Sequence, residues 1–361
     1  MKIVFVTTSF LVGGLERSSA NISNYLCNVS GVQLTVVTQY KFKHFYQLDN
    51  KIKIVEPEFK KDGVAKLFYY LKVVFFFRKQ FIIEKPDVIL SFGEHCNFQT
   101  LLAGFFLNIP IIISDRASPE LEIAFPTNLF RKLTYPFASG FIAQTDRMKQ
   151  SLIQKFGINA PISVIPNAIR QVNLYPEIPR KNQIIAVGRI HPIKQFDLLI
   201  EAFETANTKD WELLIIGEGV DSQKIQQRIS ESTKADHIHL EAKTLNLDEK
   251  FAESKVFALT SVSEGFPNSL CEAMAAGLIC VSFDIVAGPR EIINHGVNGI
   301  LLPPKSIQAL TESFNDIIAN ENKYAAMSQN ALNISEQLTL DKIGNQYLQF
   351  LISQTKSANA K

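Results

Sequence analysis

The order of the apolar segments constrains the fold of this chain most strongly. Short runs rich in β-branched residues alternate with stretches of helical periodicity, and the alternation restarts after a polar, Pro-containing segment at 171–182. The predicted strands are continuously apolar, which is typical of parallel strands that helices cover on both faces. They lie at 2–9, 33–39, 51–57, 87–93, 110–116, 140–145 and 162–167, and then at 183–189, 211–217, 237–242, 256–262, 278–284 and 299–303. The sequence therefore predicts an α/β protein with two doubly wound domains.

The length of the chain agrees with two domains, because 361 residues suffice for two cores of ordinary size. We expect a first domain at 1–168, a second at 169–339 and a last helix at 340–361. A hydrophobic fraction of 46% and a charged fraction of 20% indicate a folded protein, and the net charge of +2 gives no reason to expect nucleic acid.

The spacing of the cysteines and the length of the apolar runs indicate the cellular compartment in which the protein is expected. The four cysteines show no C-x-x-C spacing and fit a reducing compartment as small buried side chains. The short apolar start of the chain is followed by a Gly-Gly loop and does not fit a signal peptide. Since no uncharged run is long enough to span a membrane, we expect a cytoplasmic protein.

The segment EGFPNSLCEAMAAG follows the predicted strand at 256–262, and ligands of such sheets bind beyond the carboxyl ends of the strands. Asn268 is expected to be the N-cap of a helix. Ser269 and Leu270 would then lie in its first turn with free backbone N–H groups, which favour a phosphate.

Two acids flank this predicted anion site. Glu272 would border the phosphate and accept hydrogen bonds from the diol of a ribose, while Glu264 would reach the other end of the same ligand. A nucleotide-sugar has its groups in this order. The spacing alone is better explained by two acids that cap and solvate a helix.

Two cations favour the anionic ligand. In VGRIHPIK, Arg189 ends the first strand of the second domain, and Lys194 is expected at the start of the next helix. A guanidinium together with an ammonium group suits a diphosphate.

These segments carry a resemblance. GGLER, PNAI, VGRIHPIKQFDLLIEAF, LLIIGEG and EGFPNSLCEAMAAGLICVSFDIVAGPREIINHGVNGILLP resemble the retaining glycosyltransferases of family 4, most densely over 186–303. The resemblance implies the GT-B fold, in which two Rossmann-like domains face a cleft and the last helix crosses back onto the first domain. It also implies transfer of a hexose or N-acetylhexosamine from a nucleotide-sugar, with UDP favoured over GDP. The expected acceptor is a saccharide, carried on polyprenyl diphosphate, in bacterial surface polysaccharide or glycan synthesis.

The resemblance also implies roles for individual residues. Glu264 would contact the donor sugar, Glu272 the ribose, and Arg189 with Lys194 the diphosphate. The expected catalytic residues are Glu264, Arg189, Lys194 and His95; the expected donor-binding residues are Gly13, Gly14, Ser269, Leu270, Glu272 and Lys243; the expected acceptor-binding residues are Glu16, Arg17 and Arg116. Ala242, beside Lys243, departs from the Gly that many relatives have in the loop that meets the base.

Some of these residues have a second interpretation. His95 follows the strand at 87–93 and is expected to contact the donor sugar or to be a packed or surface residue, with Glu94 as the neighbouring alternative. Arg116 would bind an acceptor phosphate or form a structural ion pair, and Glu16 and Arg17 have the same ambiguity.

The expected chemistry stabilises a leaving group without a metal. Fixed cations and a helix N-terminus would stabilise the negative charge that develops on the departing diphosphate, and the chain has no D-x-D motif. We therefore expect no metal and no other cofactor. The alternatives are a mannosyltransferase that uses GDP-mannose, a GT-B sugar-nucleotide epimerase and a non-catalytic sugar-nucleotide binder; a dehydrogenase is disfavoured because no G-x-G-x-x-G follows a strand.

One predicted helix, KLFYYLKVVFFFRKQFIIEK at 66–85, is apolar nearly all round and contains Lys66, Lys72, Arg78, Lys79 and Lys85. It is interpreted either as a buried helix with extended cationic side chains or as a peripheral contact with the anionic inner face of the cytoplasmic membrane.

Overall fold

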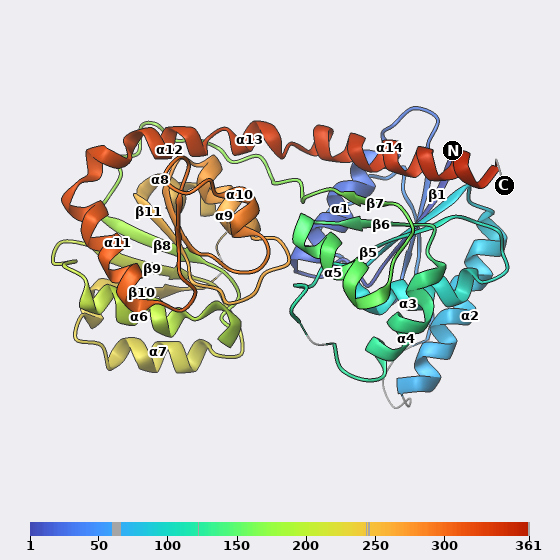
Figure 1. The fold of residues 1–361 in the computed structure, drawn as a ribbon, viewed down its shortest axis with the longest axis horizontal. Coiled ribbons are helices and arrows are strands. Elements are labelled where there is room, and N and C mark those ends of the chain that lie inside the picture. Colours follow the sequence, from blue (N-terminus) through green and yellow to red (C-terminus); the bar gives the residue numbers. More distant parts are fainter. Residues whose placement is uncertain (60–65, 122, 243, 245, 360–361) are drawn as a thin grey trace. The chain divides into compact units, whose positions relative to one another are not determined.

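The computed structural model describes residues 1–59, 66–121, 123–242, 244 and 246–359. The chain forms two compact units, of which the first comprises Met1–Ala168 together with Leu340–Lys361 and the second comprises Ile169–Thr339 (Figure 1). The four cysteines are free and buried, as expected from their spacing.

The first unit is built on a parallel sheet of seven strands in the order β3-β2-β1-β4-β5-β6-β7. Its register runs from Lys2 opposite Gln33 to Thr7 opposite Thr38 between β1 and β2. All five residues of β4 are buried, in keeping with a strand covered on both faces. The strands are β1 (Lys2–Thr7), β2 (Gln33–Thr38), β3 (Lys53–Val55), β4 (Val88–Phe92), β5 (Ile111–Ser114), β6 (Gly140–Ala143) and β7 (Ile162–Val164).

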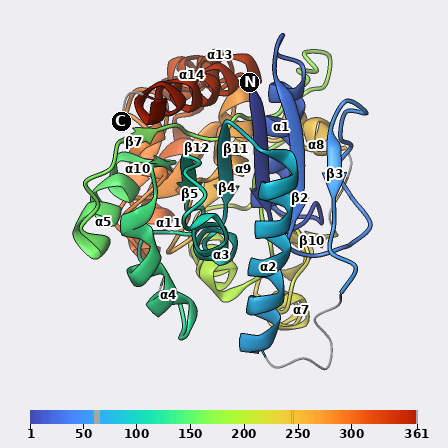
Figure 2. The same cartoon turned by 90° about the vertical axis from the view of Figure 1, so that its right-hand side faces the viewer.

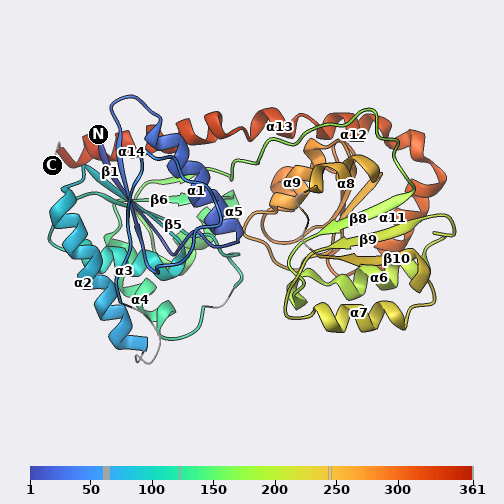
Figure 3. The same ribbon diagram turned by 180° about the vertical axis from the view of Figure 1, so that it is seen from behind.

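Helices cover both faces of this sheet. On one face α1 and α14 contact each other, although they lie at opposite ends of the chain (Figure 3). On the other face α2, α3 and α5 contribute to one apolar core. The helices are α1 (Gly14–Cys27), α2 (Lys66–Glu84), α3 (Glu94–Gly104), α4 (Thr127–Thr134), the short 3-10 helix η1 (Tyr135–Phe137), α5 (Asp146–Phe156) and α14 (Leu340–Asn359).

The second unit has a parallel sheet of six strands in the order β10-β9-β8-β11-β12-β13. Helices α6, α7 and α11 share one apolar core with this sheet, and α9 and α12 contact β12. The strands are β8 (Gln183–Val187), β9 (Glu212–Ile216), β10 (Ile238–Glu241), β11 (Val256–Leu259), β12 (Ile279–Phe283) and β13 (Ile300–Leu302). The helices are α6 (Phe196–Thr205), α7 (Ser222–Ser230), α8 (Leu247–Glu253), α9 (Asn268–Ala275), α10 (Pro289–Ile292), α11 (Ile307–Ala319), α12 (Ala325–Ala331) and α13 (Ile334–Gln337), with 3-10 helices η2 (Pro192–Lys194), η3 (Ala235–His237) and η4 (Glu321–Tyr324).

Each strand predicted from an apolar run is present, and the predicted α/β class is confirmed. Helix boundaries agree less closely: the pattern at 98–108 is shifted, because α3 begins at Glu94. Gly93, with φ of 94°, turns the chain directly from β4 into this helix. Among the described residues, no helix combines the length and the apolar character that crossing a membrane requires.

Candidate functional site

The strand order of the second unit marks where a ligand site is expected. β8 and β11 are neighbours, and from them the order runs in opposite directions, through β9 to β10 and through β12 to β13. Ligands of doubly wound sheets bind beyond the carboxyl ends of the strands at such a reversal. Arg189 follows the end of β8, and Glu264 follows the end of β11.

Lys194 and Glu264, which are 70 residues apart in sequence, form an ion pair at this edge, with 2.5 Å between Nζ and Oε1. The hydroxyl of Ser261 donates to the same carboxylate oxygen at 2.7 Å. The two charged side chains are 17% and 12% exposed, so both are partly desolvated. The sequence predicts separate ligand contacts for these two groups, whereas the structure brings them into direct contact.

The backbone around Lys194 is held by the end of β11. The Thr260 hydroxyl donates to the Lys194 carbonyl at 2.8 Å, and the Val262 amide donates to the Ile193 carbonyl at 2.9 Å. Lys194 ends η2, and α6 begins two residues later at Phe196, so the prediction that Lys194 starts the helix is wrong. The αL conformation of Gln195, with φ of 52°, separates the two elements.

Arg189 is exposed and forms no hydrogen bond or ion pair with the described part of the chain. Its guanidinium is therefore available for an external anion. An exposed guanidinium at the carboxyl edge, beside a lysine held on the neighbouring turn, is an arrangement that favours a phosphate or diphosphate.

Helix α9 begins at Asn268, and Pro267 takes the capping position. The predicted N-cap at Asn268 is wrong, because the Pro267 carbonyl already accepts the Cys271 amide at 3.2 Å. Ser269 and Leu270 do lie in the first turn, as predicted. Neither of their amides has an acceptor among the described residues, which leaves two N–H donors at the positive end of the helix.

Glu272 lies on α9, is 2% exposed, and accepts a hydrogen bond from Arg170 Nε at 3.1 Å. Arg170 also forms an ion pair with the buried Asp248 at the start of α8. Sequence reasoning missed Arg170 and Asp248, which are separated by 78 positions and belong to no spacing motif. The buried acid therefore has a structural partner in addition to its predicted ribose contact.

Gly288 was also missed, although it lies in the segment AGPRE, which belongs to the resemblance. Its φ is 94°, and a Cβ built there would lie 2.7 Å from Pro267 Cδ and 3.7 Å from Glu264 Cβ. A side chain at this position would therefore displace the turn that carries Glu264. Lys243, predicted to meet the base, lies outside the described residues.

In the first unit, Gly13 and Gly14 begin α1, just beyond the end of β1. The backbone of Gly13 is extended, with φ of 176°, and a Cβ there would meet the mobile carboxylate end of Glu16. The backbone conformation of Gly13 therefore does not itself require glycine, and its expected donor contact stays a prediction. Glu16 accepts from the Thr8 hydroxyl at 3.5 Å, and the Arg17 amide donates to the Gly13 carbonyl at 3.0 Å, as the first bond of α1.

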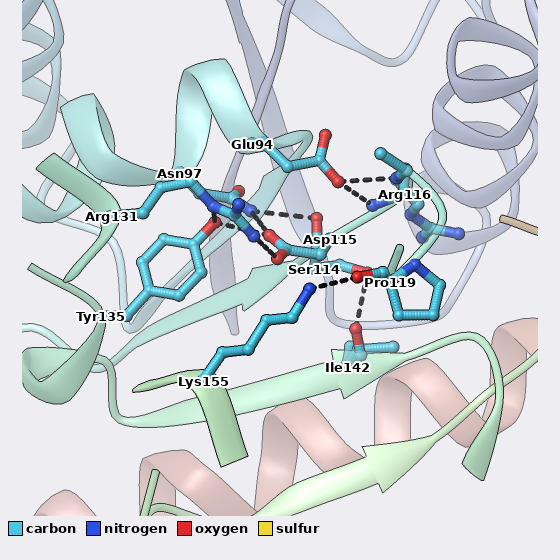
Figure 4. A network of polar contacts seen from close by, with 11 residues as sticks. Glu94, Asn97, Ser114, Asp115, Arg116, Pro119, Arg131, Tyr135, Ile142 and Lys155 are labelled. Atoms are coloured by element: carbon cyan, nitrogen blue, oxygen red, sulfur yellow. Dashed lines mark hydrogen bonds and ion pairs between the residues drawn. The ribbon is translucent and has the colours of Figure 1, made fainter. Parts of the chain in front are cut away.

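His95 and Glu94 both lie in the first turn of α3, but their environments differ. His95 is exposed, and its Nδ1 is 3.5 Å from the Thr127 hydroxyl. Glu94 is buried, and one of its oxygens accepts the amides of Arg116 and Ala117, each at 2.6 Å (Figure 4). Burial and the neighbouring carboxylate of Asp115 raise the pKa of Glu94.

Asp115 is the centre of a buried polar network beside Glu94 (Figure 4). It forms an ion pair with Arg131, and one of its oxygens accepts from the Tyr135 hydroxyl at 2.5 Å and from Asn97 Nδ2 at 2.9 Å. Burial raises the pKa of Tyr135, so this hydroxyl stays a donor. The network joins the end of β5 to α3, α4 and η1, and no sequence motif predicts it.

Arg116 lies in the same loop, but its contacts are with neutral groups. Its guanidinium donates to Asn167 Oδ1 at 2.8 Å and to the Tyr347 hydroxyl at 2.6 Å, and it lies 3.8 Å from the centre of the Phe92 ring. The ion pair considered for Arg116 is therefore replaced by contacts that tie the loop after β5 to α14.

The described residues contain no group of three or more His, Cys, Asp or Glu side chains placed to hold a metal ion.

Comparison with known proteins identifies the two units. The model for Glycosyltransferase Family 4 matches residues 12–171, and the model for Glycosyl transferases group 1 matches residues 170–333. The chain is 26% identical to the amylovoran biosynthesis glycosyltransferase AmsD of Erwinia amylovora, over 91% of this chain and 94% of the relative.

Two further similarities extend over nearly the whole length. The chain is 23% identical to the GalNAc-α-(1→4)-GalNAc-α-(1→3)-diNAcBac-PP-undecaprenol α-1,4-N-acetyl-D-galactosaminyltransferase of Campylobacter jejuni, over 99% of this chain and 100% of the relative. The crystal structure of Anabaena HepE in complex with UDP superimposes with a TM-score of 0.79 at 19% identity, covering 98% of this chain and 100% of HepE. The likeness to HepE shows the GT-B fold over 98% of the chain, and because the two family models together extend from residue 12 to residue 333, the protein belongs to the glycosyltransferases, with a family 4 domain followed by a group 1 domain.

Proposed function

We propose that this glycosyltransferase moves a hexose or an N-acetylhexosamine from a UDP-sugar to a saccharide carried on polyprenyl diphosphate, in the synthesis of a bacterial surface polysaccharide or glycan. The observation that carries the proposal is the group of anion-binding features at the carboxyl edge of β8 and β11: exposed Arg189, Lys194 in its turn, and the α9 amides. Similar structures contain UDP, and relatives are named for lipid-linked saccharide acceptors, which supports both substrates.

The donor diphosphate would be bound by side chains and backbone of the second unit. Arg189 and Lys194 supply two positive charges, and the amides of Ser269 and Leu270 supply two donors at a helix N-terminus. Glu272 accepts from the ribose hydroxyls. Glu264 exchanges part of its contact with Lys194 for the hydroxyls of the sugar, which frees the ammonium to approach the diphosphate.

Catalysis then consists mainly of stabilising the leaving group. As the anomeric C–O bond breaks, negative charge develops on the UDP β-phosphate, and fixed cations and amides lower the energy of that state. We propose that these groups act without a metal ion and that the configuration of the anomeric carbon is retained. His95, exposed at the start of α3, contacts the donor sugar, and Glu16 and Arg17 on α1 bind the acceptor.

A transfer assay tests the proposal. The purified protein is incubated with UDP- and GDP-sugars and with polyprenyl-diphosphate saccharides, and products are separated and identified by mass spectrometry and by the coupling constant of the new anomeric proton. We expect transfer from one UDP-sugar, with an anomeric configuration equal to that of the donor. Transfer from GDP-mannose alone, interconversion of the sugar nucleotide without transfer, or tight binding without turnover would each replace the proposal by one of its alternatives.

The proposed acceptor class implies that the reaction takes place at a membrane surface. A polyprenyl diphosphate keeps its chain in the bilayer and its saccharide in water, so the enzyme must work beside anionic headgroups. We therefore propose a peripheral contact with the inner face of the cytoplasmic membrane.

A further inference from the structure

An apolar surface covers the outer side of α2, the end of α3, and α4 with η1. Figure 2 shows the three helices together on one side of the first unit, and α3 contacts both α2 and α4. We call it the α2–α4 surface. On α2 it consists of Leu67, Phe68, Leu71, Phe75, Ile82 and Ile83, each between 49% and 69% exposed; beyond α2 it consists of Leu102, Phe105, Phe106, Leu129, Leu133 and Phe137, between 40% and 86% exposed.

Helix α2 is apolar on both of its faces. Tyr69, Val73 and Phe77 are buried in the core of the first unit, as expected for the inner face. The exposed residues recur at 68, 71, 75 and 82, at helical spacing on the other face. A helix on the surface of a soluble domain normally carries polar residues there, so the outer face of α2 requires another explanation.

The turn after α3 presents two aromatic rings beside this face. Arg78 on α2 donates to the carbonyls of Ala103 and Phe105, at 3.0 and 2.8 Å, and so attaches the turn to α2. Phe105 packs edge-on against Phe106 and Phe137, with ring centroids at 4.4 and 5.4 Å. Phe106 is 86% exposed and has φ of 64°, a backbone conformation that is uncommon and strained for a bulky residue.

The charges on this surface are positive. Lys72, Lys79 and Lys132 lie among the apolar residues, half-buried or exposed. In the described parts of α2, α3, α4, η1 and the turn 105–109, the carboxylates are Glu84, which is bound by Lys53 and Thr35, and the buried Glu94. In these described segments, large apolar side chains mix with cations and no exposed carboxylate is free of a cation, which matches the boundary between the acyl chains and the anionic headgroups of a bilayer.

We propose that the α2–α4 surface is the part of the enzyme that docks on an anionic lipid bilayer. The rings of Phe75, Phe106 and Phe137 enter the boundary between headgroups and acyl chains, and the lysines contact headgroup phosphates. This inference deepens the proposed function, on which it rests, by naming the surface that brings the enzyme to a lipid-linked acceptor.

Sedimentation of the full chain with vesicles tests the surface. Phosphatidylglycerol vesicles and phosphatidylcholine vesicles are compared at equal lipid concentration. The variants are Phe75→Ser/Phe106→Ser and Lys79→Glu/Lys132→Glu, which replace exposed side chains. The matched controls are Leu174→Ser/Val220→Ser and Lys209→Glu, which replace exposed side chains of the second unit.

We expect the wild type and both controls to bind phosphatidylglycerol vesicles more tightly than phosphatidylcholine vesicles. The double Phe variant should bind both kinds of vesicle at least about tenfold more weakly, because two large side chains no longer leave water. The double Lys variant should lose about fivefold or more per lysine on phosphatidylglycerol, and little on phosphatidylcholine.

Three results would overturn the inference: no vesicle binding by the wild type, equal loss in the control variants, or a concentration-dependent dimer in lipid-free buffer that the Phe variant abolishes. The last would assign the surface to a second copy of the chain. Transfer to a water-soluble, short-chain acceptor separates the two proposals. The Phe variant should retain that activity. A wild-type protein that binds vesicles but transfers no sugar would contradict the proposed function, while the assignment of the α2–α4 surface to membrane binding would remain supported.

Discussion

Replacing Lys194 by methionine separates its contact with Glu264 from its proposed contact with the leaving diphosphate. The change removes the charge and keeps most of the length of the side chain. In the free protein it leaves the Glu264 carboxylate, which is 12% exposed, with Ser261 as its remaining hydrogen-bond donor among the described residues. Loss of a charge-assisted hydrogen bond at such a partly desolvated site lowers the free energy of unfolding by about 1.5–3 kcal/mol.

The effect on the barrier to transfer should be larger than the effect on the free energy of unfolding. Loss of one fixed group that stabilises charge in the transition state raises the barrier by about 2–4 kcal/mol. At about 1.36 kcal/mol for each factor of ten, the rate falls roughly 30- to 900-fold. The assay is release of UDP from the donor under saturating acceptor, with unfolding followed by circular dichroism on the same samples.

The double variant Lys194→Met/Glu264→Gln is the control for stability. It removes the carboxylate that the single variant leaves without its cation, so the unfolding free energy should return toward the wild-type value while transfer stays slow. A single variant that transfers sugar within about threefold of the wild type, a barrier change of about 0.7 kcal/mol, would refute the reasoning. The ion pair would then serve only to hold the turn after β8.

Three other outcomes are expected. Glu272→Gln should weaken binding of both the UDP-sugar and free UDP by about 1.5–3 kcal/mol in calorimetry, whereas Glu264→Gln should weaken the UDP-sugar alone; equal effects on UDP would reverse the proposed orientation of the donor. Transfer should continue in excess EDTA, and a loss that Mg²⁺ restores would contradict the metal-free mechanism. Burial and the carboxylate of Asp115 raise the pKa of Glu94 above its ordinary value of 4.5. Protonated Glu94 therefore stabilises the folded protein fully at pH values below 4.5, and this stabilisation is lost as the pH rises through the raised pKa. In urea titrations Glu94→Gln, which retains an acceptor oxygen for the two amides, should therefore lose less stability than the wild type over that range, and parallel pH profiles would be evidence against the assignment.

The sequence predicts strands better than it predicts contacts between distant charges. Every strand corresponds to an apolar run, because strands buried on both faces leave a continuous apolar signal. The N-cap at Asn268 was predicted from residue preference, and the structure instead starts α9 after Pro267, whose carbonyl makes the first helical bond.

The ion pairs of the candidate site could not be predicted from the sequence, for a different reason. The pairs Lys194–Glu264 and Arg170–Glu272 join positions 70 and 102 residues apart, and a pairing at such a distance has no period that a sequence can display. Asp115 and Arg131 are only 16 residues apart, but they lie on different elements, after β5 and on α4, and their spacing fits no regular period. The sequence shows the apolar composition of α2, but it does not show which of its residues face outward.

The position of α14 has a consequence for the order in which the protein is made. A ribosome synthesises every residue of the second unit, Ile169–Thr339, before it reaches α14, which belongs to the first unit. Until then the nascent first unit lacks Tyr347, which packs against Phe92 of β4 and accepts a hydrogen bond from Arg116. The unit that begins synthesis is therefore the one that finishes folding last, and a chain that stops before Leu340 contains a complete second unit and a first unit that lacks the helix packed against α1 and β4.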